Sequence, residues 1–280
     1  MRPLLTRRRF LHGLVAVTGL TGLYTWRVEP TWVEFVRRDL PIARLPPALA
    51  GKTLVQLSDI HIGSQVDDDY VSRVFAQVTA LNPDLVVHTG DLVTYAGPKT
   101  LAQTKAVLAT FPRGKLGTFA TLGNHDYGKR WAEPAVADQV SRLLTDAGCT
   151  VLRNRSADVA GLRIVGLDDM WAHRFFPQLV LPRLRPGQPA LVLSHNPDTC
   201  DLPVWGGYSG WILAGHTHGG QCKPPFLPPP LLPVRNRRYT AGEFALAGNR
   251  RLYINRGVGH LLRVRFNARP EVTVFTLTPA

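Results

Sequence analysis

Short apolar runs alternate with segments of helical periodicity along the chain from Lys52 onward. Runs such as TLVQL have the length and composition of strands, whereas residues 67–81 begin with three acidic residues and continue with apolar positions at helical spacing. The pattern predicts strands at 53–61, 83–91 and 115–126 and helices at 67–81, 99–111 and 132–148. Such alternation predicts an α/β fold with strands buried on both faces.

Apolar runs in the second half of the chain lie closer together. They predict strands at 150–153, 162–168, 190–194, 211–214, 251–255 and 272–277. The short connections favour a second sheet with more antiparallel pairing. Residues 27–50, with their prolines, are typical of an extended linker or an edge strand, and the apolar loop KPPFLPPPLLP at 223–233 cannot be a regular helix or a central strand.

The N-terminus resembles an export signal. Residues 6–11, TRRRFL, are similar to the twin-arginine pattern, and an apolar run follows from Phe10 to Trp26. The alternative is a basic start to the helix of a soluble protein. We expect export by the twin-arginine translocase to the periplasmic or extracytoplasmic face, with residues 10–26 retained as a membrane anchor because no A-x-A cleavage site follows.

These patterns divide the chain into three parts. Residues 1–26 are the predicted signal and anchor, 27–50 the predicted linker, and 51–280 the predicted catalytic domain. The whole chain carries a formal net charge of +13. A basic surface attracts anionic lipid, phosphorylated substrates or nucleic acid. Because no aromatic and basic strip is evident, we expect no nucleic-acid partner but do expect contact with a membrane surface. The three cysteines are far apart and predict no disulfide framework.

Polar side chains that can bind metals follow five of the predicted strands. They are Asp59 and His61, then Asp91, then Asn124 with His125 and Asp126, then His195, and last His216 and His218. Ligands of open α/β sheets bind beyond the carboxyl ends of strands, so we expect these side chains to meet. Carboxylate, amide and imidazole groups without thiolate suit Mn²⁺, Fe or Zn²⁺. Even seven of these side chains are too many ligands for one ion, whereas two ions bridged by one carboxylate would use seven.

The ordered blocks D-x-H, G-D, G-N-H-D, H and G-H-x-H resemble those of the calcineurin-like metallophosphoesterases. GHTHGGQ, NRGVG at 255–259 and PEVTVFTL at 270–277 look like an exported or membrane-anchored subfamily related to the UDP-2,3-diacylglucosamine pyrophosphatases. The resemblance implies a four-layer sandwich of two mixed sheets flanked by helices. It also implies two divalent cations and a phosphodiester or pyrophosphate substrate that is anionic and lipid-linked in some relatives.

The same resemblance implies a role for each motif residue. Asp59, His61 and His218 would bind the first ion, Asn124, His195 and His216 the second, and Asp91 both. His125 would protonate the leaving group, with Asp126 orienting it. A hydroxide held between two cations would then attack phosphorus in line.

Several residues and functions stay open at this level. His88 is expected to pack in the core, and His173 with Arg174 line either the substrate cleft or a surface loop. Loop 223–233 either packs on the domain or contacts lipid. The alternative functions are a UDP-2,3-diacylglucosamine pyrophosphatase of lipid A synthesis, a nuclease, and a metal-dependent binding protein for anionic wall polymer with little turnover.

Overall fold

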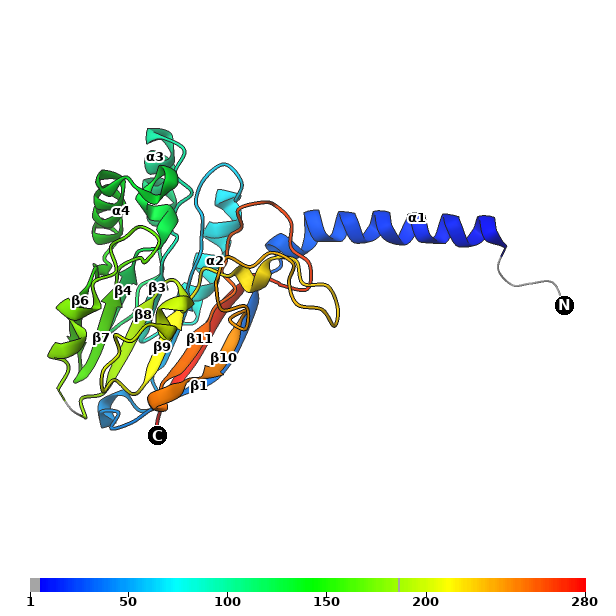
Figure 1. Cartoon of the computed structure of the whole chain (residues 1–280). Helices are drawn as coiled ribbons and strands as arrows, with labels where there is room; N and C mark the ends of the chain where they lie inside the picture. The colour runs from blue at the N-terminus through cyan, green and yellow to red at the C-terminus, as the bar shows by residue number, and fades with distance from the viewer. Residues whose placement is uncertain (1–5, 186) are drawn as a thin grey trace.

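The protein consists of two β-sheets packed face to face, with α-helices on the outer face of one of them (Figure 1). This computed structural model describes residues 6–185 and 187–280. The first sheet has six strands in the order β1 (Glu34–Ile42), β12 (Glu271–Pro279), β2 (Thr53–Leu57), β3 (Leu85–Thr89), β4 (Gly117–Thr121) and β5 (Thr150–Val151). The predicted fold class, two mixed sheets flanked by helices, is confirmed.

The second sheet also has six strands. Their order is β10 (Gly242–Ala245), β11 (Arg251–Ile254), β9 (Trp211–Ala214), β8 (Ala190–Ser194), β7 (Leu162–Leu167) and β6 (Arg155–Val159). Only the two edge pairs, β10 with β11 and β6 with β7, are antiparallel, and the four central strands are parallel. The first sheet has one antiparallel pair, β12 with β2. The expected antiparallel bias of the second sheet is therefore confined to its edges.

Three apolar layers hold the sandwich together. One layer lies between the sheets, where Leu54 and Phe119 of the first meet Leu191 and Leu213 of the second. A second layer joins the outer face of the first sheet to α2 (Asp68–Ala80), α3 (Pro98–Leu108) and α4 (Pro134–Asp146). A third lies under loops and short 3₁₀ turns that cover the second sheet. All three predicted helices are therefore present, within a few residues of their expected bounds.

Strand register delivers the site loops to one edge. In the parallel strands β2, β3 and β4, Val55 lies opposite Val86, and Val86 lies opposite Thr118. The carboxyl ends of the strands therefore align, and the loops that leave them lie next to one another. The predicted strands extend beyond the observed ones at this edge, because the motif residues turn sharply there instead of continuing the ladder.

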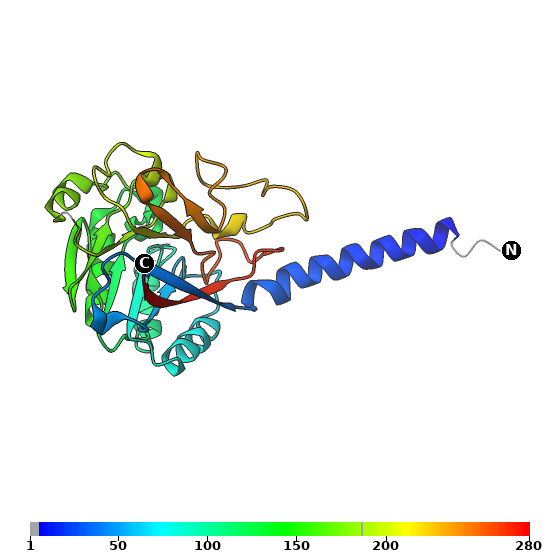
Figure 2. The ribbon, with the colours of Figure 1, turned by 90° about the horizontal axis from the view of Figure 1, so that it is seen from below.

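The N-terminal segment includes both a strand and a projecting helix. Within residues 27–50, β1 forms an edge strand parallel to β12, so the sheet begins before the boundary predicted at residue 51. Helix α1 (Arg7–Leu23) projects away from the sandwich, and every one of its residues is exposed (Figures 1 and 2). The first five residues of the predicted signal lie outside the described residues. In the described part of the chain, no helix combines the length and the apolar character needed to cross a membrane.

Candidate metal centre

The structure brings the predicted ligands together as two groups of buried side chains. The first group is Asp59, His61 and His218, and the second is Asp91, His195 and His216. Within each group the ligand atoms all lie within 4.8 Å of one another. The side chains come from loops after β2, β3, β8 and β9, so both sheets contribute to the site. The arrangement therefore has the ligand set of two adjacent cation sites.

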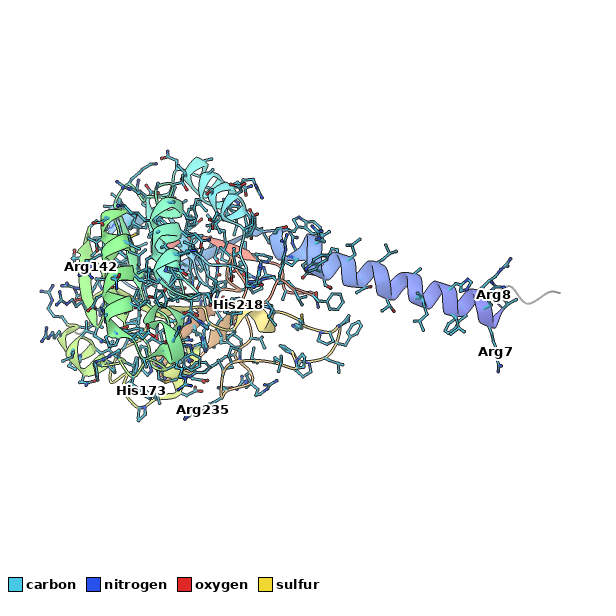
Figure 3. The ribbon with its side chains drawn as sticks, turned by 90° about the horizontal axis from the view of Figure 1, so that it is seen from above. Arg7, Arg8, Arg142, His173, His218 and Arg235 are labelled. Carbon is cyan, nitrogen blue, oxygen red and sulfur yellow. The ribbon has the colours of Figure 1, made fainter. Side chains whose placement is uncertain are left out.

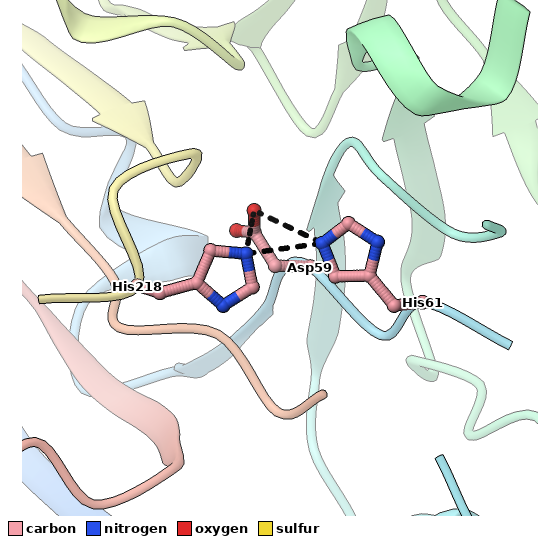
Figure 4. Close-up of side chains that lie close together, drawn as sticks. All are labelled: Asp59, His61 and His218. Carbon is pink, nitrogen blue, oxygen red and sulfur yellow. Dashed lines mark hydrogen bonds and ion pairs between the residues drawn. The ribbon is translucent and has the colours of Figure 1, made fainter. Parts of the chain in front are cut away.

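Three ligand atoms converge in the first group (Figure 4). Nε2 of His61 lies 3.0 Å from Nε2 of His218. Oδ1 of Asp59 lies 3.4 Å from Nε2 of His218 and 3.9 Å from Nε2 of His61. Two imidazole nitrogens and a carboxylate oxygen at these separations leave room for one cation among them. This donor set suits a divalent first-row metal.

The second group is centred on His195. Its Nε2 lies 3.1 Å from Oδ2 of Asp91 and 3.2 Å from Nδ1 of His216. Asn124 is fully buried, and neither polar atom of its side chain has a hydrogen-bond partner among the described residues. A buried amide without a partner is costly, so Asn124 fits the role of a further ligand.

Asp91 connects the two groups. The Oδ2 atom that lies near His195 is also 3.8 Å from Nε2 of His61. Its other oxygen, Oδ1, accepts a hydrogen bond of 2.8 Å from the backbone N–H of His125. The carboxylate is thus oriented toward both ligand groups, as a bridging ligand must be.

The backbone at these loops is strained. Five ligands have a positive φ, with values between 49° and 72°: Asp59, His61, Asp91, His216 and His218. Non-glycine residues rarely adopt this conformation, which costs about 1–3 kcal/mol each and is concentrated at functional sites. Gly123 is required beside them, because a Cβ there would collide with Oδ1 of Asp91. Packing that overrides such strain fixes the direction in which each ligand side chain points.

Neighbouring polar groups orient the ligands. The Nδ1–H of His195 donates to the carbonyl oxygen of Thr89 at 2.8 Å, which leaves Nε2 free to bind a cation. Nδ1 of His61 lies 2.9 Å from the hydroxyl oxygen of Thr94. The hydroxyl of Ser58 donates to Oδ2 of Asp59 at 2.5 Å. Thr94 and Ser58 carry no motif signature, and their roles were not foreseen.

Arg265 is a further residue that the sequence did not reveal. It is fully buried, and its Nη2 lies 3.4 Å from Nδ1 of His218. Its guanidinium donates to the carbonyl oxygens of Ala268 at 2.7 Å and Gly259 at 2.6 Å. The NRGVG segment lies in the same loop and the PEVTVFTL segment follows it, but neither signal includes Arg265 itself. Arg265 fixes the loop that packs against Asp59 and His218.

Burial and mutual repulsion shift the pKa values of the ligands. Burial raises the pKa of Asp59 to about 6, and the charge of Asp91 adds to the shift. For His195, burial lowers the pKa but the carboxylates of Asp91 and Asp59 outweigh it, and the pKa rises to about 10. Burial lowers the pKa of His216 to about 3. The centre therefore concentrates negative charge in a buried space, which favours a bound cation.

His125 and Asp126 lie at the site but do not pair with each other as expected. The ring of His125 is half-buried and stands edge-on to that of His61, with centroids 5.1 Å apart. The Asp126 carboxylate accepts from the backbone N–H groups of Asp91 at 3.0 Å, Gly123 at 2.9 Å and Val93 at 3.1 Å. The hydrogen bonds described for Asp126 thus fix the loop of Asp91, and none of them goes to the His125 imidazole.

The other histidines lie outside the ligand groups. His88 is buried, with its ring 6.4 Å from that of Phe111. His260 places Nε2 3.0 Å from the carbonyl oxygen of Gln65. His173 is exposed and lines a groove together with Arg174. For His173 and Arg174, the sequence left open a cleft or a surface loop, and the structure favours a cleft beside the site.

Comparison with known proteins agrees with this geometry. The sequence profile described as calcineurin-like phosphoesterase matches residues 52–220. The chain belongs to the calcineurin-like phosphoesterase family. All seven predicted metal ligands, with His125 and Asp126, fall inside the matched range, and this phosphoesterase is accordingly a metal-dependent hydrolase.

Several curated proteins are similar to this phosphoesterase over nearly its whole length. Phosphodiesterase YaeI of Escherichia coli is 33% identical, covering 98% of this chain and 100% of that protein. The uncharacterized metallophosphoesterase YkuE of Bacillus subtilis is 32% identical over 98% of each chain. The UDP-2,3-diacylglucosamine pyrophosphatase LpxG of Chlamydia muridarum is 28% identical, covering 94% of this chain and 95% of that protein.

Proposed function

We propose that this phosphoesterase hydrolyses phosphodiester or pyrophosphate bonds with two divalent cations of Mn, Fe or Zn. The observation that carries the proposal is the position of Asp91, whose Oδ2 is 3.1 Å from His195 Nε2 and 3.8 Å from His61 Nε2. One carboxylate oriented toward two ligand groups suits a pair of cations. When bound, such cations neutralise phosphoryl oxygens and lower the pKa of a water molecule that can attack phosphorus.

The chain itself supplies the proton and the alignment. His125 is tied to Asp91 by its backbone N–H, and its half-buried ring stays accessible to a substrate. A ring nitrogen of His125 can donate its proton to the ester oxygen that leaves. Asp126 acts indirectly. Its carboxylate accepts hydrogen bonds from the backbone amides of Asp91 and Gly123 and so fixes the orientation of the bridging carboxylate.

The substrate class follows from the relatives. A phosphodiester of the cell envelope is our first candidate, supported by the likeness to the E. coli phosphodiesterase. UDP-2,3-diacylglucosamine is the second, supported by the likeness to the chlamydial pyrophosphatases. Export would argue against the second candidate, because UDP-linked substrates are cytoplasmic. A panel of lipid and nucleotide phosphoesters, each assayed with the metal-loaded protein, separates the two.

The central test is hydrolysis of bis-p-nitrophenyl phosphate with added Mn²⁺. We expect the wild-type protein to release nitrophenolate and His125→Ala to be at least ~100-fold slower, the usual contribution of a general acid. Arg142→Gln, on the exposed face of α4, is the control and should keep full activity. If wild type and His125→Ala are equally inert while both bind anionic wall polymer, the protein is a binding module and the proposal fails.

We also propose export by the twin-arginine translocase and attachment to the outer face of the membrane. The support is α1, which exposes apolar side chains including Phe10, Val15 and Leu20 and presents Arg7 and Arg8 at its far end (Figure 3). Replacing Arg7 and Arg8 by Lys should leave the protein in the cytoplasm. Cell fractionation with a size comparison tests this, and equal export of the variant would refute it.

Loop 223–233 is proposed to contact lipid near the anchor. Phe226 is fully exposed, and Leu227 and Leu231 are largely exposed. Arg237 donates to the carbonyl oxygen of Pro229 at 2.7 Å, which places a cation against the middle of the loop. We expect Phe226→Ser with Leu227→Ser to reduce co-sedimentation with anionic liposomes severalfold. Unchanged binding would show that the loop has no such role.

A further inference from the structure

A groove of about 890 Å³ lies beside the metal centre. We call it the arginine groove, and its defining residues are Arg130, Trp131, Trp171, His173, Arg174 and Arg235. They come from three connections: Arg130 and Trp131 follow β4, Trp171, His173 and Arg174 follow β7, and Arg235 lies between β9 and β10. His173 and Arg235 lie near each other on one side of the molecule, as their labels show (Figure 3). None of these residues has a part in the chemistry proposed above.

The two tryptophans join the groove to the catalytic residues. The ring of Trp171 stands edge-on to that of His216, with centroids 4.4 Å apart. The ring of Trp131 lies 4.9 Å from that of Trp171 and 6.1 Å from that of His125. Both rings also line the groove. A substrate whose phosphodiester lies at the metal centre can therefore extend along this aromatic wall into the groove.

The three arginines have free guanidinium groups. Across residues 6–185 and 187–280, no hydrogen bond or ion pair is described for the side chain of Arg130, Arg174 or Arg235. A nearby arginine that is paired is Arg153, whose side chain contacts Asp138 and Asp168. Three unpaired guanidinium groups around one groove suit an anionic ligand, because each can donate two parallel hydrogen bonds to a phosphate.

The backbone beneath these arginines is held in place. Oδ2 of Asp198 accepts from the backbone N–H of Arg235 at 2.7 Å, and the side-chain amide of Asn154 donates to the carbonyl oxygen of Arg174 at 2.8 Å. Arg130 and Trp131 have φ values of 53° and 59°, a conformation that non-glycine residues adopt only where the surrounding structure imposes it. The groove is thus anchored by its backbone while its charged ends stay available.

We propose that the arginine groove binds a second phosphate group of the substrate. The substrate class is a phosphodiester one of whose alcohol groups carries a further phosphate. The diester lies at the metal centre, the carbon chain passes along Trp131 and Trp171, and the terminal phosphate meets the three guanidinium groups. This inference rests on the proposed phosphoesterase function and adds a specificity site to it.

The test compares glycerophosphoglycerol with the same compound carrying a terminal phosphate. With Mn²⁺ present, ³¹P NMR should give a kcat/KM about tenfold higher for the phosphorylated compound, the order expected for charge-assisted Arg–phosphate contacts. The diacyl forms of both compounds in detergent micelles show whether the preferred source is a lipid headgroup or a soluble ester. Either source supports the second phosphate site if its phosphorylated form is preferred.

The groove variant is Arg130→Gln with Arg174→Gln and Arg235→Gln. We expect its ratio of kcat/KM values to fall to about one. The matched control replaces three exposed arginines outside the groove by Gln, namely Arg73, Arg142 and Arg155, and removes the same net charge. The control should keep the tenfold ratio. A ratio that is unchanged in the groove variant, or lost equally in the control, overturns the inference.

A binding experiment tests the second phosphate site independently of whether the protein hydrolyses phosphodiesters. Isothermal titration calorimetry in EDTA measures the affinity of both soluble compounds while hydrolysis is blocked. We expect the phosphorylated compound to bind about tenfold more tightly to wild type than the unphosphorylated one, and equally to the groove variant. If the diesters are hydrolysed without preference and bind equally, this inference fails while the phosphoesterase proposal stands.

Discussion

The two ligand groups of the metal centre share Asp91 but differ in their surroundings. Behind the first group, the buried guanidinium of Arg265 lies 3.4 Å from Nδ1 of His218. Around the second, the pKa of His195 is lowered by burial but raised more strongly by the carboxylates of Asp91, Asp59 and Asp169. A positive charge behind a ligand opposes a bound cation, and negative charges favour one. We therefore expect the two groups, whose ligands are similar, to bind a cation with different affinities.

The two groups also differ in how their histidines are oriented. His61 is oriented by the side-chain hydroxyl of Thr94, whereas His195 is oriented by the backbone carbonyl of Thr89. A substitution can remove a hydroxyl, but no substitution removes a carbonyl. The first group is thus open to tuning by mutation of its supporting residue, and the second is not.

The largest effect should come from the residue that the groups share. Asp91→Asn removes the charge that faces both groups, so we expect fewer than two bound ions and a kcat lower by about 10²–10³. Metal analysis and hydrolysis of bis-p-nitrophenyl phosphate measure the two effects. Asp146→Asn, at an exposed position of α4, should change neither. A variant that kept two ions and normal activity would show that Asp91 is not the bridge.

Loss of one histidine from either group should empty one half of the site. We expect His216→Ala and His218→Ala each to bind a single Mn²⁺, because the remaining group keeps its own ligands. Metal analysis gives the number of ions, and electron paramagnetic resonance shows whether the coupled pair is gone. If both variants still bound two ions per chain, the assignment of these histidines to separate ions would be wrong.

The supporting threonines offer a matched pair. Thr94→Val should lower the affinity of the first group for its ion by about 10–100-fold, the usual effect of losing a hydrogen bond to a metal ligand. Thr89→Val keeps the carbonyl that accepts from His195 and should leave the second ion in place. Calorimetric titration with Mn²⁺ measures both. Equal losses in the two variants would remove the distinction drawn between the groups.

The smallest expected effect is the difference in intrinsic affinity. The His216→Ala variant retains the first group and the His218→Ala variant the second. We expect the first to bind Mn²⁺ about tenfold more weakly because of the charge of Arg265, which corresponds to ~1.4 kcal/mol in binding free energy. Titration of both variants under the same conditions makes the comparison. The reverse order would mean that Arg265 does not control affinity.

The fold was predictable where the sequence pattern is strong. Helices α2, α3 and α4 carry apolar positions at helical spacing and were found close to their expected bounds. The strands that were not predicted, β6 and β10, are short edge strands with sequences RSADV and GEFA, and most of their residues are not buried. Edge strands need to bury only one side, so they lack the apolar runs by which central strands are recognised.

The site was predictable where ligand chemistry restricts the residue type. Asp59, His61 and Asp91 belong to motifs that only a metal site explains well. Thr94 and Arg265 act through geometry that the fold creates, and an isolated threonine or arginine carries no signal in a sequence. The partners of Asp126 were not predicted for the same reason. They are backbone amides, which every residue type except proline has, so the sequence shows no pattern for them.

Ligands from both sheets make cation binding a late event in biosynthesis. Asp59 and His218 are 159 positions apart in the chain, and each follows a strand of a different sheet. No fragment that ends before residue 218 contains all the ligands, so we expect the ions to bind only after synthesis has passed residue 218 and the two sheets have docked. The ion that the protein acquires is therefore selected by the metal pool of the compartment in which folding is completed.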